Sequence, residues 1–311
     1  MPPQTRRSML LASAAGAATT FLAGRPGFGG LLAGPLTHGL VDEKATSDMS
    51  FGLVTYQWGK DMDLPTLIDT CEKSGVLGVE LRTEHRHGVE PSLSKAERDE
   101  VRKRFETSPV QLIGYGSNAQ FHEADPAKVK ANIELTKQYI QLMHDCGGSG
   151  VKVKPNGFVK DVPREQTIEQ IGKALNEVAE YGQQYGQQIR VEVHGPGTCE
   201  LPVIKAIFDV ADHPNVAVCW NSNGEDLTGE GLEHNFNLVK DRFGATCHVR
   251  ELTLRDYPYK ELFQLFKGID YAGWILLEAR TEPTDKVAAL IEQREAFEKL
   301  VAHAQTSSLN R

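Results

Sequence analysis

The chain has 311 residues, with 34 basic against 42 acidic side chains and a formal net charge of −8 at pH 7. This charge argues against nucleic-acid binding, because lysine and arginine would have to neutralise many phosphates. The five cysteines show neither C-x-x-C spacing nor a paired rhythm, so we expect buried free thiols rather than disulfides or a thiolate metal site; they are Cys71, Cys146, Cys199, Cys219 and Cys247.

The N-terminus resembles an export signal. Arg6 and Arg7 precede a small-residue apolar stretch, residues 12–24, a pattern typical of twin-arginine (Tat) signals. The stretch is shorter than the roughly 18 residues that a membrane span needs, and it is rich in alanine and glycine. We therefore expect residues 1–47 to be a signal and linker that engage the Tat export machinery. The remaining chain would then act in the periplasm or another extracytoplasmic space, without stable membrane insertion.

Residues 48–311 alternate short apolar segments with longer amphipathic ones, the pattern of strands and helices. The predicted strands are 51–58, 76–82, 110–115, 150–154, 189–193, 216–220, 245–250 and 274–279. The predicted helices are 64–74, 95–107, 125–146, 164–185, 201–211, 231–243, 259–266 and 284–303. Eight strand–helix units within these 264 residues indicate an α/β fold, a single (β/α)8 TIM barrel of about 250 residues. An open doubly wound sheet usually has fewer strands and often has a glycine-rich phosphate loop after the first.

Four strands in the second half of the chain end in residues that can bind a metal. These are Glu192, Asn221, His248 and Glu278, at intervals of 29, 27 and 30 residues. Each interval is about one βα unit of roughly 30 residues, and successive barrel strands end at the mouth where active sites form. Two carboxylates, an amide and an imidazole at one mouth predict a divalent metal with oxygen and nitrogen ligands.

Alternation along the strands adds further polar side chains to the inner face near the mouth. So many ionisable groups inside a barrel are costly unless they are paired or bind a metal. For the residues outside the predicted metal site, ion pairing and substrate contact both stay open, and for His194 so does a hydrogen bond to a metal ligand. The full inner-face set is Glu80, Arg82, Lys152, Lys154, Glu192, His194, Asn221, His248, Glu278 and Arg280.

At these segments the chain resembles the xylose isomerase-like TIM-barrel superfamily. More narrowly, it is similar to the sugar phosphate isomerase/epimerase group, which includes ketose 3-epimerases, inosose dehydratases and hydroxypyruvate isomerases. The resemblance spans about residues 50–303 and is most specific at Tyr271-Ala272-Gly273-Trp274, which leads into the strand that ends at Glu278. Other matching segments are 78–82, 191–194, 218–221 and 248–251.

The resemblance implies that Glu192, Asn221, His248 and Glu278 bind Mn²⁺, Mg²⁺, Co²⁺ or Zn²⁺. It also implies that Glu192 and Glu278 move a proton at the carbon next to a sugar carbonyl, so that the protein is a ketose or keto-sugar isomerase or epimerase. The metal would stabilise the enediolate. The side chains expected to contact the sugar are His194, Lys152, Lys154, Glu80 and Arg255, although the spacing of Arg255 from His248 is about one residue off the epimerase pattern.

Asn221 departs from the family, which usually has aspartate at this position. An amide can coordinate a metal through its carbonyl oxygen but brings no negative charge, so we expect weaker metal binding. Asp226, in the loop that follows, is a candidate substitute ligand.

Three other functions remain open. If a leaving group lies β to the carbonyl, the same proton abstraction makes the protein a lyase or dehydratase of keto-sugars, keto-glycosides or inososes. With a degenerate metal site it would be a sugar-binding barrel without activity. Phosphodiester chemistry of the endonuclease IV type is disfavoured by the acidic charge and by the lack of further histidine ligands. The sequence leaves open whether the chain forms a homo-oligomer.

Overall fold

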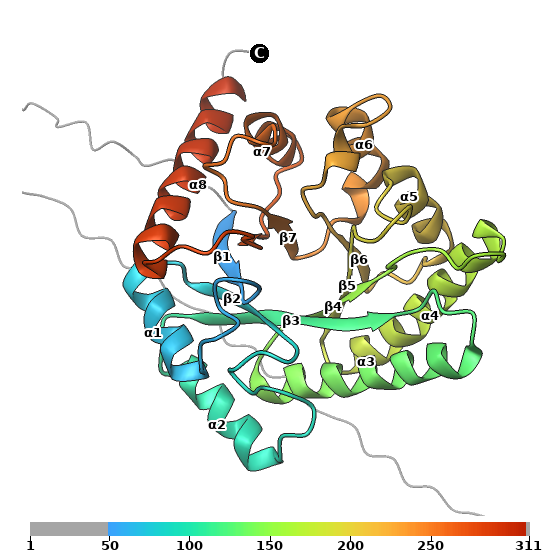
Figure 1. Cartoon of the computed structure of the whole chain (residues 1–311), viewed down its shortest axis with the longest axis horizontal. Helices are drawn as coiled ribbons and strands as arrows, with labels where there is room; N and C mark the ends of the chain where they lie inside the picture. The colour runs from blue at the N-terminus through green and yellow to red at the C-terminus, as the bar shows by residue number, and fades with distance from the viewer. Residues whose placement is uncertain (1–48, 309–311) are drawn as a thin grey trace, which may run out of the picture. The chain divides into compact units, whose positions relative to one another are not determined.

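Eight short parallel strands form one sheet in the computed structural model of the chain, which describes residues 49–308. The sheet order is β6-β5-β4-β3-β2-β1-β8-β7. Between the two end strands, the His248 amide donates to the Trp220 carbonyl oxygen at 2.7 Å, and the Gly244 amide donates to that of Val218 at 2.9 Å. These bonds close the sheet into a barrel (Figure 1). The strands are β1 Ser50–Val54, β2 Gly78–Arg82, β3 Gln111–Gln120, β4 Gly150–Lys154, β5 Gln188–Glu192, β6 Val216–Cys219, β7 Thr246–Val249 and β8 Trp274–Leu277.

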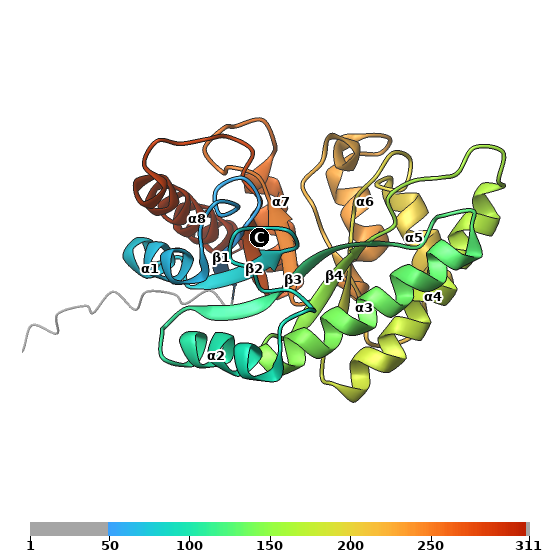
Figure 2. The same cartoon turned by 60° about the horizontal axis from the view of Figure 1, so that its bottom comes forward.

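A helix follows every strand, so the described residues form the predicted (β/α)8 barrel, with the helices placed around the strands (Figures 1 and 2). The α1 helix begins where the Asp63 carboxylate accepts from the Thr66 amide at 2.9 Å and ends at Gly75, whose φ of 70° suits glycine. The helices are α1 Leu64–Ser74, α2 Lys95–Glu106, α3 Pro126–Cys146, α4 Arg164–Gln184, α5 Leu201–Val210, α6 Leu232–Val239, α7 Tyr259–Gly268 and α8 Lys286–Ser308, with short 3-10 turns η1 Gly224–Leu227 and η2 Lys240–Arg242.

Two strand boundaries differ from the prediction in ways that matter for the barrel mouth. The β1 strand ends at Val54 rather than at residue 58, because the chain turns there and the Trp58 indole donates to the Thr281 carbonyl oxygen at 2.8 Å. The β3 strand continues five residues beyond the predicted end, to Gln120, which pairs with Lys154 of β4. This extension carries Asn118 to the mouth.

Glycines in β3 and β4 make room for charged side chains inside the barrel. A Cβ atom on Gly114 or Gly150 would lie 2.7 Å from the guanidinium of Arg190. That buried guanidinium donates to the Ile113 carbonyl oxygen and to the Ser149 hydroxyl, at 3.1 and 2.8 Å. Arg190 therefore fills the barrel below the mouth with its donors satisfied.

The five cysteines are buried free thiols, as predicted. No helix within residues 49–308 is long and apolar enough to cross a membrane. The predicted export signal, residues 1–47, lies outside the described residues.

Candidate metal and active site

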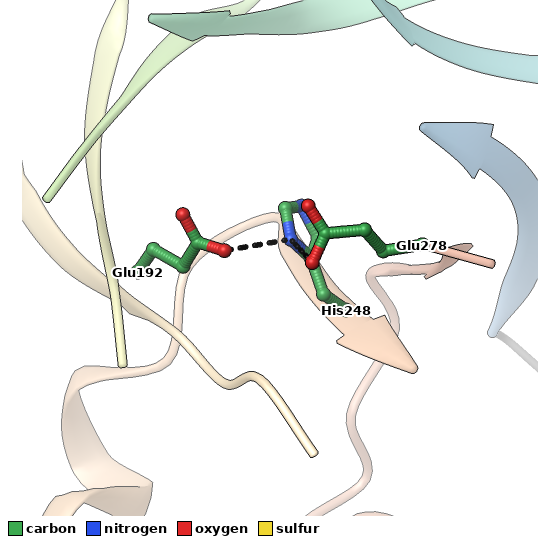
Figure 3. Close-up of side chains that lie close together, drawn as sticks. All are labelled: Glu192, His248 and Glu278. Carbon is green, nitrogen blue, oxygen red and sulfur yellow. Dashed lines mark ion pairs between the residues drawn. The ribbon is translucent and has the colours of Figure 1, made fainter. Parts of the chain in front are cut away.

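Three predicted ligands meet at the C-terminal ends of β5, β7 and β8. The Nδ1 atom of His248 lies 3.6 Å from Oε1 of Glu192 and 3.9 Å from Oε2 of Glu278, and all three residues are buried. Figure 3 shows the Glu192 and Glu278 side chains extending from different strands toward the imidazole. One ligand atom from each residue lies within 4.8 Å of the others, a spacing that can hold a metal ion.

Glu80 orients His248 from the other edge of the ring. Its Oε1 atom lies 3.2 Å from Nε2 of His248, and both side chains are completely buried. A carboxylate at this edge favours the proton on Nε2 and directs the Nδ1 lone pair toward the glutamates. Neither ring nitrogen of His248 and neither oxygen of Glu80 makes a hydrogen bond within the described residues, so Glu80 acts on Nε2 through its charge at 3.2 Å while Nδ1 is left unpaired. An unpaired buried nitrogen between two carboxylates fits a divalent metal.

Two side chains hold Glu192 in place. Lys152 donates to Oε2 at 2.5 Å, and the Asn221 amide nitrogen donates to Oε1 at 3.0 Å. Burial alone would raise the pKa of Glu192, but Lys152 and His248 outweigh burial and hold this pKa well below its ordinary value. Burial alone would lower the pKa of His248, but Cys219, Glu80 and Glu192 together raise it well above its ordinary value. A metal bound to Nδ1 would therefore displace a proton.

A second ion pair lies nearer to solvent. Arg82 donates to Oε1 of Glu278 at 3.1 Å and stacks over the Tyr56 ring, 5.0 Å from its centroid. The same guanidinium donates to the Asn118 side-chain oxygen at 3.2 Å, and Lys154 donates to that oxygen at 3.3 Å. Oε2 of Glu278 stays directed toward His248. The site thus has one carboxylate bound at both oxygens, Glu192, and one bound by a cation at a single oxygen, Glu278.

Residues 68–223, half of the chain, match the xylose isomerase-like TIM barrel family. The chain belongs to this family. No curated protein sequence gives a match.

Solved structures with the same fold include sugar epimerases. L-ribulose 3-epimerase has a TM-score of 0.71 at 15% identity, over 83% of this chain and 96% of its own. The IolI protein with a bound zinc atom has a TM-score of 0.69 at 15% identity, over 82% and 98%. The 3-keto-D-glucoside 4-epimerase YcjR from E. coli has a TM-score of 0.65 at 12% identity, over 83% and 99%. At these identities the likeness shows the fold.

The fold brings most of the predicted site residues of this family member together. Lys152 contacts the proposed ligand Glu192, and Glu80 contacts His248. Lys154 and Arg82 donate to the same side-chain oxygen of Asn118. His194 is half-buried, and its Nδ1 atom has no hydrogen-bond partner among the described residues.

Two predicted residues lie elsewhere. Arg255 is exposed after β7, with a φ of 58°, and lines a separate surface hollow together with residues of α7 and α8. Asp226 does not join the metal group. Its carboxylate accepts from the Tyr257 hydroxyl at 2.7 Å and from the backbone amide of Asn223 at 2.8 Å. Asn221 therefore has no substitute carboxylate from this loop.

Sequence reasoning missed Asn118 and Gly116. A Cβ atom on Gly116 would lie 3.1 Å from both Arg82 and Glu80 and 3.2 Å from Lys152, so the glycine lets these three side chains converge. The signal is the alternation of Gly114, Gly116 and Asn118, which continues the inner face of β3 past its predicted end.

Proposed function

We propose that the protein is a divalent-metal-dependent isomerase or epimerase of ketoses or keto-sugars. The observation that carries this proposal is the pair of buried carboxylates, Glu192 and Glu278, facing the unpaired Nδ1 atom of His248. Proton transfer at a carbon next to a carbonyl needs a positioned base and a conjugate acid on the opposite face. The membership of the chain in a family whose fold is shared by sugar epimerases supports the same chemistry.

Glu192, His248 and Glu278 would hold the metal, with the Asn221 carbonyl oxygen as a neutral fourth donor. When bound, the metal would polarise the carbonyl and hydroxyl oxygens of the sugar and stabilise negative charge as it develops. The four donors are neutral or singly charged, a set suited to Mn²⁺, Co²⁺ or Zn²⁺ and also to Mg²⁺.

The protein's own residues divide the remaining work. Glu278 takes the proton, because its Oε2 atom accepts no hydrogen bond from the described side chains around it. Glu192, which approaches the same Nδ1 atom of His248, is the residue that returns a proton to the opposite face of the substrate carbon. Lys152 and Arg82 fix the two carboxylates through one ion pair each. His194, which is half-buried, contacts sugar hydroxyls.

A Glu278→Gln variant tests this function. Glutamine keeps the size and one oxygen of the side chain but cannot accept the proton. Exchange of the substrate's α-proton with solvent deuterium, followed by NMR on a panel of ketoses and keto-glycosides, should be abolished in the variant while the fold is unchanged. Exchange that continues at the wild-type rate would rule out a role for Glu278 as the base.

The unequal surroundings of the two glutamates favour one second candidate, a lyase or dehydratase. Glu192 is bound at both oxygens by Lys152 and Asn221, whereas Glu278 has one oxygen available as a base. β-Elimination needs only one carboxylate base, followed by loss of the leaving group. Mass spectrometry of the product separates the two functions, because an epimer has the mass of its substrate and an elimination product does not.

Export is a separate proposal. We propose that residues 1–47 direct the protein to an extracytoplasmic space through the Tat pathway, on the basis of Arg6 and Arg7 and the apolar stretch that follows. A reporter fused after residue 48 should be exported from a Tat-competent host and retained when both arginines are changed to lysine. Export that is unaffected by these changes would contradict the assignment.

A further inference from the structure

The barrel interior at and just below the candidate site contains more lysine and arginine side chains than carboxylates. Lys152 is paired with Glu192, and Arg82 with Glu278, while Glu80 serves His248. Four cations therefore accompany three carboxylates before any metal is added. The cations are Arg82, Lys152, Lys154 and Arg190.

Lys154 is the one of these cations that lies at the mouth without a carboxylate partner, because Arg190 lies deeper in the barrel and donates to neutral acceptors. Among residues 49–308, no carboxylate lies within ion-pair distance of its ammonium group, whose hydrogen bond goes to the neutral Asn118 oxygen at 3.3 Å. Arg82 donates to the same oxygen at 3.2 Å, so two positive charges converge on one uncharged atom. Burial and the positive charge of Lys152 lower the pKa of Lys154 to about 8. A positive potential of this kind favours an anion.

The contacts of Arg82 and Lys154 with Asn118 lie nearer to solvent than the Lys152–Glu192 contact. The Lys152–Glu192 contact is buried and the Arg82–Glu278 contact is partly buried, whereas both hydrogen bonds to Asn118 are exposed to solvent. A molecule that enters from the mouth therefore meets Arg82 and Lys154 before it reaches the glutamates. Arg82 connects the partly buried contact and the exposed one, because it donates to Glu278 and to Asn118 with different nitrogens.

We propose that the substrate carries an anionic group, a carboxylate or a phosphate, which binds between Arg82 and Lys154 at the position of the Asn118 side-chain oxygen. This inference rests on the proposed function, because it places the anion on the same keto-sugar whose α-carbon lies at Glu278. Arg82 and Lys154 together donate at least two charge-assisted hydrogen bonds to such a group. A divalent metal in the site adds to the positive potential and strengthens the preference.

Calorimetric binding to the full chain tests the proposal with three probes of the same ketose framework. D-fructose is neutral, 2-keto-D-gluconate carries a carboxylate, and D-fructose 6-phosphate carries a phosphate. At least one anionic probe should bind about 10-fold tighter than D-fructose or better, as expected for a hydrogen-bonded ion pair that is partly shielded from water. The probe that wins identifies the anion, and its affinity should fall as salt is added.

Lys154 variants locate the preference. Lys154→Met should remove most of the difference between the anionic and neutral probes, and Lys154→Arg should keep it. Lys160→Met is the matched control, because Lys160 is exposed in the same loop after β4 and has no part in the site. Its preference should equal that of the wild type.

Three results would overturn the proposal: equal affinity for neutral and anionic probes, no measurable binding of either anion, or an undiminished preference in Lys154→Met. Because the readout is equilibrium binding, it does not depend on turnover. If the wild-type protein exchanges no substrate proton with solvent for any sugar that it binds, the proposed function is refuted, and the anion preference can still be measured. Proton exchange on D-fructose together with equal affinity for neutral and anionic probes would support the proposed function and refute the anion preference.

Discussion

Replacing Glu80 with glutamine tests how the site prepares His248 for a metal. Glu80 lies 3.2 Å from Nε2 of His248 with both side chains completely buried. At that distance two unit charges attract by about 5 kcal/mol at an effective dielectric constant of about 20. This is an upper bound, because the full attraction needs a charged imidazole and the contact lacks hydrogen-bond geometry. Partners of metal-binding histidines typically change metal affinity by about 10–100-fold.

We therefore expect Glu80→Gln to weaken Mn²⁺ or Zn²⁺ binding by about 10-fold and Glu80→Ala by about 100-fold. Calorimetric titration of the chelator-treated protein measures both affinities, and circular dichroism checks that the fold is intact. Asp226→Asn is the control: Asp226 is a buried carboxylate that contacts Tyr257 and Asn223 rather than His248, so its loss should leave the affinity unchanged. Equal affinities in wild type and both Glu80 variants would refute the orienting role of Glu80.

Three further changes have expected outcomes. Lys152→Met leaves Glu192 without its cation and should destabilise the metal-free protein by about 3–5 kcal/mol in urea unfolding, less when Mn²⁺ is present; an unchanged midpoint would contradict the pairing. Gly116→Ala places a Cβ 3.1 Å from Arg82 and should cost about 1–3 kcal/mol in the same assay, whereas a stabilised variant would show that the side chains above Gly116 are not tightly packed. Burial raises the pKa of Asp226 from 3.8 to about 7, so the folded state keeps a proton that the unfolded state loses. Stability should therefore fall by up to about 4 kcal/mol as pH rises from about 4 to 7, and Asp226→Asn should flatten that slope in thermal melts; parallel slopes would exclude the buried acid as its cause.

The regular spacing of Glu192, His248 and Glu278 was enough to predict that these residues meet. Each follows an apolar strand that fits one βα unit, and the barrel closure that unites them needs only the count of eight units. In the structure, one ligand atom from each of the three residues lies within 4.8 Å of the others. The topology of the barrel, rather than a local motif, brings them together.

The pairing of charges inside the mouth could not be predicted in the same way. The alternation of side chains predicted that Lys152 lies on the inner face. Its ion pair with Glu192 depends on the β4–β5 register, in which Lys152 lies opposite Arg190. The reach of a long flexible side chain then selects one carboxylate among several. For the same reason the sequence left a structural role and a substrate role equally open for Lys152.

The predicted ends of β1 and β3 were wrong for reasons that lie in their local sequences. The glycine, serine and asparagine residues after Tyr115 have low strand propensity, so β3 was predicted to end there, yet pairing with β2 and β4 extends it to Gln120. After Val54 the aromatic residues look like a continued strand, but a hydrogen bond from the Trp58 indole to Thr281 holds a turn instead. Tertiary contacts override local preference at both places, and both lie at the mouth.

Metal content tests the central claim most directly. The full chain, purified without chelator and dialysed with Mn²⁺, Co²⁺ or Zn²⁺, should hold about one divalent ion per wild-type molecule by mass spectrometry. Asn221→Asp should hold the ion more tightly, because it restores a negative charge beside Glu192. An empty wild type beside a filled Asn221→Asp variant would show that Asn221 has disabled the site and would point to a sugar-binding protein without metal chemistry. Wild type and variant both empty would contradict the assignment of Glu192, His248 and Glu278 as metal ligands.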